Sequence, residues 1–243
     1  MNWYKNMKLV LASNRLKLPL EEILPQINKI VDDIIKRYDT YVKSPKYPRP
    51  YALIIFEDFY TKKEKKVFPK TDFTQDIRDR SLAHYNLMDV SITIYPAKAI
   101  KLGYAENEYD PNFRTKLIGS ILHELSHVAD PKMDKSKDLW FSKEETISNI
   151  NENLRKNNIG PYLSFPPEID AIMQQVIYDI EIYFRSGEKN ATEVKKWLEK
   201  PLNVAFEPIK SIIGSNNVNV IEYWIDHNPK IIRMLKQRIY NVI

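Results

Sequence analysis

The sequence predicts an α+β fold in which a small antiparallel or mixed sheet precedes a mostly helical second half. Two short β-prone runs, at residues 51–56 and 90–95, lie in the first half of the chain. From residue 112 onward, apolar residues recur every three or four positions, which is typical of amphipathic helices. Strands gathered in one part of a chain and helices in another indicate the α+β class.

The composition indicates an ordinary globular protein of one domain, with room for a small extension. Of the 243 residues, 43% are hydrophobic and 28% are charged, and the net charge is +5. Cysteine is absent, which excludes disulfides and thiolate ligands, so a bound zinc ion would need histidine and carboxylate ligands. The sequence contains no GxGxxG pattern, which argues against the usual nucleotide-binding loop.

The first predicted helix covers residues 18–42, and a proline-rich stretch at 44–50 follows it. We expect the run at 51–56 to form a hairpin with residues 65–69 across the lysine-rich segment 62–66. That segment is interpreted as a solvated turn rather than a nucleic-acid-binding patch. The run at 90–95 alternates apolar and polar residues, which favours an antiparallel strand with one wetter face.

Further helices are predicted at residues 112–129, 142–156, 165–186, 191–200 and 217–241. We expect residues 1–187 to form the main domain and residues 188–243 to form a helical extension or cap packed on it. The apolar run near the start of the chain is too short for a signal peptide, and no segment is long enough to span a bilayer. A soluble protein, cytoplasmic by default, is therefore expected.

The candidate chemistry lies in the motif His123-Glu124-Leu125-Ser126-His127. In a helix, His127 lies about 40° and Glu124 about 100° from His123, on the side away from the apolar residues. Two histidines one turn apart can bind one Zn²⁺, and a neighbouring glutamate can pass a proton from water to a leaving amine. The motif predicts a zinc-dependent hydrolase. Two alternatives are a pair of solvated histidines on a surface helix and a metal-binding protein without turnover.

A catalytic zinc site needs a third protein ligand, and Glu168 is the candidate. Pro166 and Pro167 suit a first helical turn, so Glu168 would lie at the start of the helix 165–186. Acidic residues are also favoured there by the helix dipole alone, and Asp130 and Asp170 are the alternative ligands. If Glu168 is the ligand, both aspartates are expected just outside the ligand set. Asp130 would accept a histidine N–H or cap its helix.

An HExxH helix followed by Glu-x-x-Ala on a second helix resembles the gluzincin group of zinc metallopeptidases. The pattern HELxHxxD, followed by Tyr-x-x-x-Pro-x-Glu-Ile-Asp-Ala, is similar to small metallopeptidase-like proteins of phages and bacteria. The resemblance covers residues 90–185. It implies a zincin-like fold, zinc bound by His123, His127 and Glu168, and Glu124 as general base in peptide hydrolysis. It also implies that an extended peptide substrate adds to the strand 90–95 as to a sheet edge.

Two groups of residues complete the sequence-based expectations. Tyr162 is a candidate hydrogen-bond donor to the oxyanion formed in peptide hydrolysis, although packing at a loop–helix junction explains it equally well. His84 and His227 fall outside any ligand spacing and are interpreted as surface histidines.

The expected partner is a peptide or protein substrate, with no role for a membrane or nucleic acid. The alternative function is a catalytically silent zincin-like protein of a virus particle, since the first five residues resemble starts of tailed-phage proteins.

Overall fold

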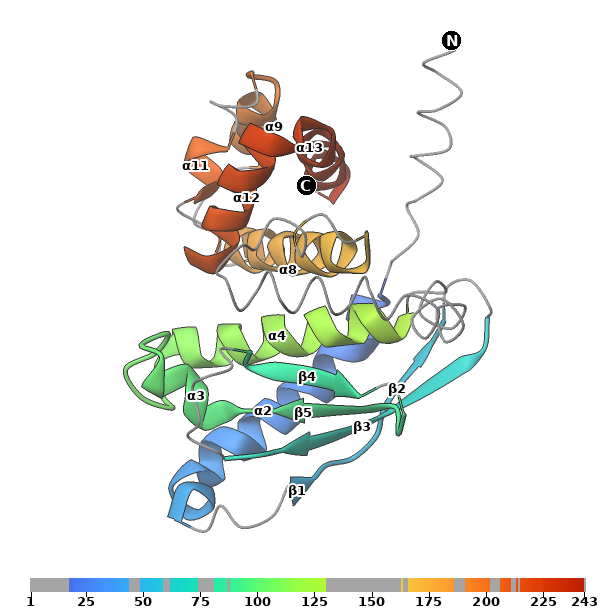
Figure 1. Cartoon of the computed structure of the whole chain (residues 1–243), viewed down its shortest axis with the longest axis vertical. Coiled ribbons are helices and arrows are strands. Elements are labelled where there is room, and N and C mark those ends of the chain that lie inside the picture. Colours follow the sequence, from blue (N-terminus) through green and yellow to red (C-terminus); the bar gives the residue numbers. More distant parts are fainter. Residues whose placement is uncertain are drawn as a thin grey trace. The chain divides into compact units, whose positions relative to one another are not determined.

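The computed structural model describes residues 18–43, 49–58, 62–73, 81–86, 88–129, 163, 166–185, 191–201, 206–210, 213 and 215–242. The chain divides into two compact units, Met1–Ser136 and Lys137–Ile243. The helix that ends at residue 185 shares one hydrophobic core with the C-terminal helices, and the domains predicted at 1–187 and 188–243 stay a prediction. The α+β class is confirmed, with a small open mixed sheet and several helices (Figure 1).

A five-stranded sheet forms the centre of the first unit. Its strands are β1 (Arg49–Pro50), β2 (Ile54–Glu57), β3 (Glu64–Thr71), β4 (Ala83–Asn86) and β5 (Ser91–Ile94). The strand order is β1-β3-β5-β4, and β2 pairs with β3 beside this path. The predicted hairpin is confirmed, because β2 and β3 are antiparallel with Ile54 opposite Val67.

The strand β5 is interior rather than the sheet edge that the sequence suggested. It pairs in parallel with β3 and antiparallel with β4, and three of its four residues are buried. The strand β4 ends the sheet among the described strands. Sequence analysis missed β4 because four residues, of which only Ala83 is buried, give too little apolar alternation to be recognised.

Three helices complete the described part of the first unit, and they are α2 (Leu20–Lys43), α3 (Pro96–Lys101) and α4 (Pro111–Ala129). The first and last of them confirm the helices predicted at 18–42 and 112–129. Ile27 of α2, Ile94 of β5 and Leu117 of α4 are completely buried and belong to the core of this unit. The helix α4 runs along β4 and also contacts β5 (Figure 1). This places the HExxH motif beside the last strand of the sheet.

A side chain of α2 completes the outer side of β2. Gln26 Nε2 donates a hydrogen bond to the carbonyl oxygen of Ile55 at 2.7 Å, and the N–H of Ile55 donates to Gln26 Oε1 at 3.0 Å. Backbone groups on the outer side of such a strand find no partner in the sheet and need one elsewhere. The amide of Gln26 therefore takes the place of one residue of a further strand.

The second unit is helical in its described part. Its helices are α8 (Pro166–Arg185), α9 (Ala191–Leu198), α11 (Glu207–Lys210), α12 (Ser215–His227) and α13 (Pro229–Val242). The helices predicted at 165–186 and 191–200 are confirmed, and the one predicted at 142–156 lies outside the described residues. The single helix predicted at 217–241 is wrong. Pro229 has no N–H to continue α12, and it begins a new helix instead.

One hydrophobic core joins these helices. Met173 of α8, Ile221 and Trp224 of α12, and Leu235 of α13 are all completely buried within it. The C-terminal helices are thus part of the same core as α8 rather than an addition to its surface. None of the helices in the described ranges combines the length and the apolar character that crossing a membrane requires.

We expect Gln26→Met to lower the free energy of unfolding by about 1–3 kcal/mol, because it leaves two backbone groups of Ile55 unsatisfied. Urea unfolding measures this loss, and hydrogen exchange should show faster exchange of the Ile55 amide. Lys29 is exposed on the same helix, and Lys29→Met, the matched control, should change stability by less than about 0.5 kcal/mol. Equal protection of the Ile55 amide in variant and wild type would contradict this account.

Candidate metal centre

The helix α4 presents two histidines one turn apart. The ring centroids of His123 and His127 are 5.0 Å apart, and their planes are inclined by 82°. Elsewhere on the helix, Leu117, Ile121 and Leu125 are completely buried. Because these apolar side chains fix the rotation of α4 about its own axis, they also fix the side from which the imidazoles project.

The carboxylate of Glu124 binds the backbone of the last strand of the sheet. Its Oε2 accepts a hydrogen bond from the N–H of Tyr85 at 2.8 Å. The N–H of Tyr95 donates to the carbonyl oxygen of Leu82, so Leu82 directs its polar groups toward β5. Along an antiparallel strand, successive residues direct their backbone N–H and C=O groups alternately to one side and to the other. Tyr85, three residues later, therefore directs its N–H away from β5, and Glu124 binds it on the outer side of β4. Sequence analysis did not foresee this contact.

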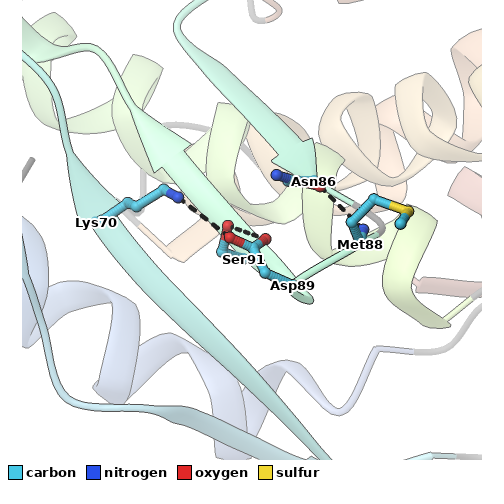
Figure 2. Close-up of polar contacts among 5 residues, drawn as sticks. All are labelled: Lys70, Asn86, Met88, Asp89 and Ser91. Carbon is cyan, nitrogen blue, oxygen red and sulfur yellow. Dashed lines mark hydrogen bonds and ion pairs between the residues drawn. The ribbon is translucent and has the colours of Figure 1, made fainter.

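Polar contacts fix the turn that joins β4 to β5 (Figure 2). The N–H of Met88 donates to Asn86 Oδ1 at 2.9 Å, and the hydroxyl of Ser91 donates to the Asp89 carboxylate at 2.6 Å. Lys70 Nζ lies 3.4 Å from the other oxygen of Asp89. The Ser91 hydroxyl, aided by the Lys70 ammonium, lowers the pKa of Asp89 from its ordinary value. The charged carboxylate thereby ties the turn to β3.

Val90, in the same turn, has a left-handed backbone conformation with φ of 50°. A β-branched residue rarely adopts this conformation, which costs on the order of 1–3 kcal/mol and persists only where the surroundings impose it. The carbonyl oxygen of Val90 accepts a hydrogen bond from the N–H of Phe68 at 3.1 Å. Together with the contacts of Asp89, this bond ties the turn before β5 to β3.

Glu168 lies in the first turn of α8, where the sequence predicted it. The alternative ligand Asp170, two residues later, makes a different contact. Its Oδ1 lies 2.9 Å from Nη2 of Arg238 in α13. Asp170 is not in the group of described residues that could share a metal ion. Asp170 thus forms an ion pair within the second unit, and its expected place just outside the ligand set stays a prediction.

The structure brings together ligand atoms of His123, His127 and Glu168. One ring nitrogen from each histidine and one carboxylate oxygen all lie within 4.8 Å of one another. A tetrahedral zinc ion with bonds of about 2.0–2.1 Å keeps its ligand atoms about 3.4 Å apart. Two imidazoles and one carboxylate are a set that zinc accepts while a fourth position stays open. The residues present fit zinc.

The remaining candidates fall into two groups. Tyr162 and Asp130 lie outside the described residues, so their predicted roles stay predictions. His84 and His227 are both exposed, as expected. The ring of His227 stacks on Tyr223 with centroids 4.5 Å apart, which accounts for it without a metal.

Comparison with known proteins adds no family to these observations. The chain matches no protein-family model, no curated protein and no solved structure.

We expect the purified protein to bind about one zinc ion per chain, and each of His123→Ala, His127→Ala and Glu168→Gln to weaken that binding. Replacing a residue that supports a ligand lowers zinc affinity by about 10–100-fold. These variants remove a ligand itself, so the loss of affinity should be larger. Competition against a chromophoric chelator measures the affinity. His84→Ala serves as the control and should bind zinc like the wild type. An affinity unchanged in Glu168→Gln would remove Glu168 from the ligand set.

Proposed function

We propose that the protein is a zinc-dependent peptidase with a zincin-like fold. His123, His127 and Glu168 hold the zinc ion, and Glu124 is the general base. The observation that carries this proposal is the approach of two imidazole nitrogens and a carboxylate oxygen to within 4.8 Å of one another. A zinc ion held there supplies a Lewis acid, which polarises a carbonyl group and makes water a better nucleophile near neutral pH.

The proton transfers are assigned to Glu124. It follows His123 directly on α4 and is partly buried, and its carboxylate is held by the N–H of Tyr85. A carboxylate in this position accepts a proton from the attacking water and then delivers it to the departing amine nitrogen. The bond from Tyr85 is charge-assisted and directional, so it limits the orientations available to the carboxylate.

Among the described strands β4 ends its sheet, and its outer edge favours a peptide as the substrate. Alternation along β4 directs the backbone groups of Ala83 and Tyr85 away from β5. An extended peptide that adds to this edge would pair with the N–H and carbonyl of Ala83. The Tyr85 N–H is engaged by Glu124. The substrate strand is thus assigned to β4, in place of the interior strand at 90–95.

Replacing the proposed base should separate catalysis from metal binding. We expect Glu124→Gln to retain zinc while kcat falls by about 10²–10⁴-fold, the usual contribution of general acid–base catalysis. Cleavage of a peptide library, followed by mass spectrometry, measures activity without a known substrate. Glu106→Gln changes an exposed glutamate of the same unit and is the control. A wild-type protein that binds zinc but cleaves no peptide would support the catalytically silent alternative instead.

The hydrogen bond from Tyr85 can be removed by proline without breaking the sheet. Tyr85→Pro deletes an N–H that points away from β5, a position where an outer strand tolerates proline. We expect a fall in kcat of about 10–100-fold from misorientation of Glu124, with zinc affinity and circular dichroism unchanged. Tyr85→Ala is the matched control, since it removes the same side chain and keeps the N–H. Equal activity of the two variants would show that the N–H has no role.

A further inference from the structure

The C-terminal helices of the second unit contact the chain at two points that bracket Glu168, one before α8 and one within it. The indole N–H of Trp224 in α12 donates to the carbonyl oxygen of Leu163 at 2.9 Å, and both residues are buried. The guanidinium of Arg238 in α13 binds Asp170 at 2.9 Å, with side chains that are only 13% and 18% exposed. Leu163 precedes Glu168 by five residues and Asp170 follows it by two. The start of α8 is therefore fixed on either side of the proposed ligand.

Helical geometry links the position of Asp170 to the direction of Glu168. Residues two apart on an α-helix point about 200° apart, so an Asp170 carboxylate held by α13 directs Glu168 to the other side of α8. The residues of α8 that contribute to the core lie between the two, at about 40–180° from Glu168. They are Ile169, Ile172, Met173, Val176, Ile177 and Ile180. The core and the ion pair together fix the rotation of α8.

A small rotation of α8 about its own axis would displace a metal ligand on it. A side-chain atom about 5–6 Å from the helix axis moves by about 2 Å when the helix turns by about 20°. A zinc ligand must meet its bond length to within about 0.2 Å. An anchor that restricts this rotation therefore influences zinc affinity even though it does not touch the ion.

We infer that Arg238 and Trp224 are positioning residues for the ligand Glu168, so that helices without a ligand of their own set the zinc affinity of the centre. The inference rests on the proposed function in one respect, namely that Glu168 binds zinc. Simple electrostatics gives the opposite expectation for Arg238. Removing a cation near a bound cation strengthens binding, so a loss of zinc affinity in an Arg238 variant is attributable to position rather than to charge.

The test is a double-mutant cycle on zinc affinity. We expect Arg238→Met to weaken zinc binding by about 10–100-fold when Glu168 is present. In a Glu168→Gln background the same change should have no further effect, because the anchored ligand is already gone. Trp224→Phe, which keeps the ring and loses the N–H donor, should follow the same pattern. Chelator competition gives the affinities, and the visible spectrum of the Co²⁺ form reports the geometry of the ligands.

Lys210→Met is the matched control. It breaks another ion pair of the second unit, between Lys210 of α11 and Glu222 of α12 at 3.0 Å, and should leave zinc affinity unchanged. Two results would overturn the inference alone: no loss of affinity in Arg238→Met and Trp224→Phe, or the same loss with and without Glu168. If the proposed function fails instead, the result is distinguishable, because the wild type would then bind no zinc.

Discussion

A helix presents a ligand in a defined direction only when its rotation about its own axis is fixed, and burial of apolar side chains does this for α4. Leu117, Ile121 and Leu125 are completely buried, and each contributes about 1.5–3 kcal/mol relative to exposure. A rotation that moved the histidines away from their present direction would expose these side chains together. The direction of His123 and His127 is therefore a consequence of the core. The same holds for α8, whose apolar residues belong to the core of the second unit.

Burial alone sets such directions coarsely, since apolar contacts are not directional. Hydrogen bonds weaken steeply when their angle or distance departs from the optimum, so they refine what packing begins. In the first unit the refining contact joins Glu124 to the N–H of Tyr85. In the second it joins Asp170 to Arg238. Each engages a carboxylate within two residues of a proposed metal ligand.

The parts of the fold that could be predicted from the sequence are those with a local signal. Helical periodicity placed α2, α4 and α8 to within two residues at each end, and the HExxH spacing singled out the histidines. The position of β5 between two strands could not be predicted, because parallel pairing with β3 leaves no mark on neighbouring residues. The break of the last helix had a visible signal in Pro229, which the apolar periodicity on either side obscured.

The contact between Tyr85 and Glu124 lay beyond sequence analysis for a different reason, and that reason bears on the chemistry. Any residue except proline supplies a backbone N–H, so the identity of residue 85 carries no information about it. In an uninterrupted antiparallel ladder this N–H would bind a carbonyl of the added peptide strand. Because Glu124 takes it, the peptide carbonyl opposite Tyr85 loses its partner in the ladder. Within the proposed function, the peptide group left without that bond is the one beside the general base, where the reacting carbonyl is expected.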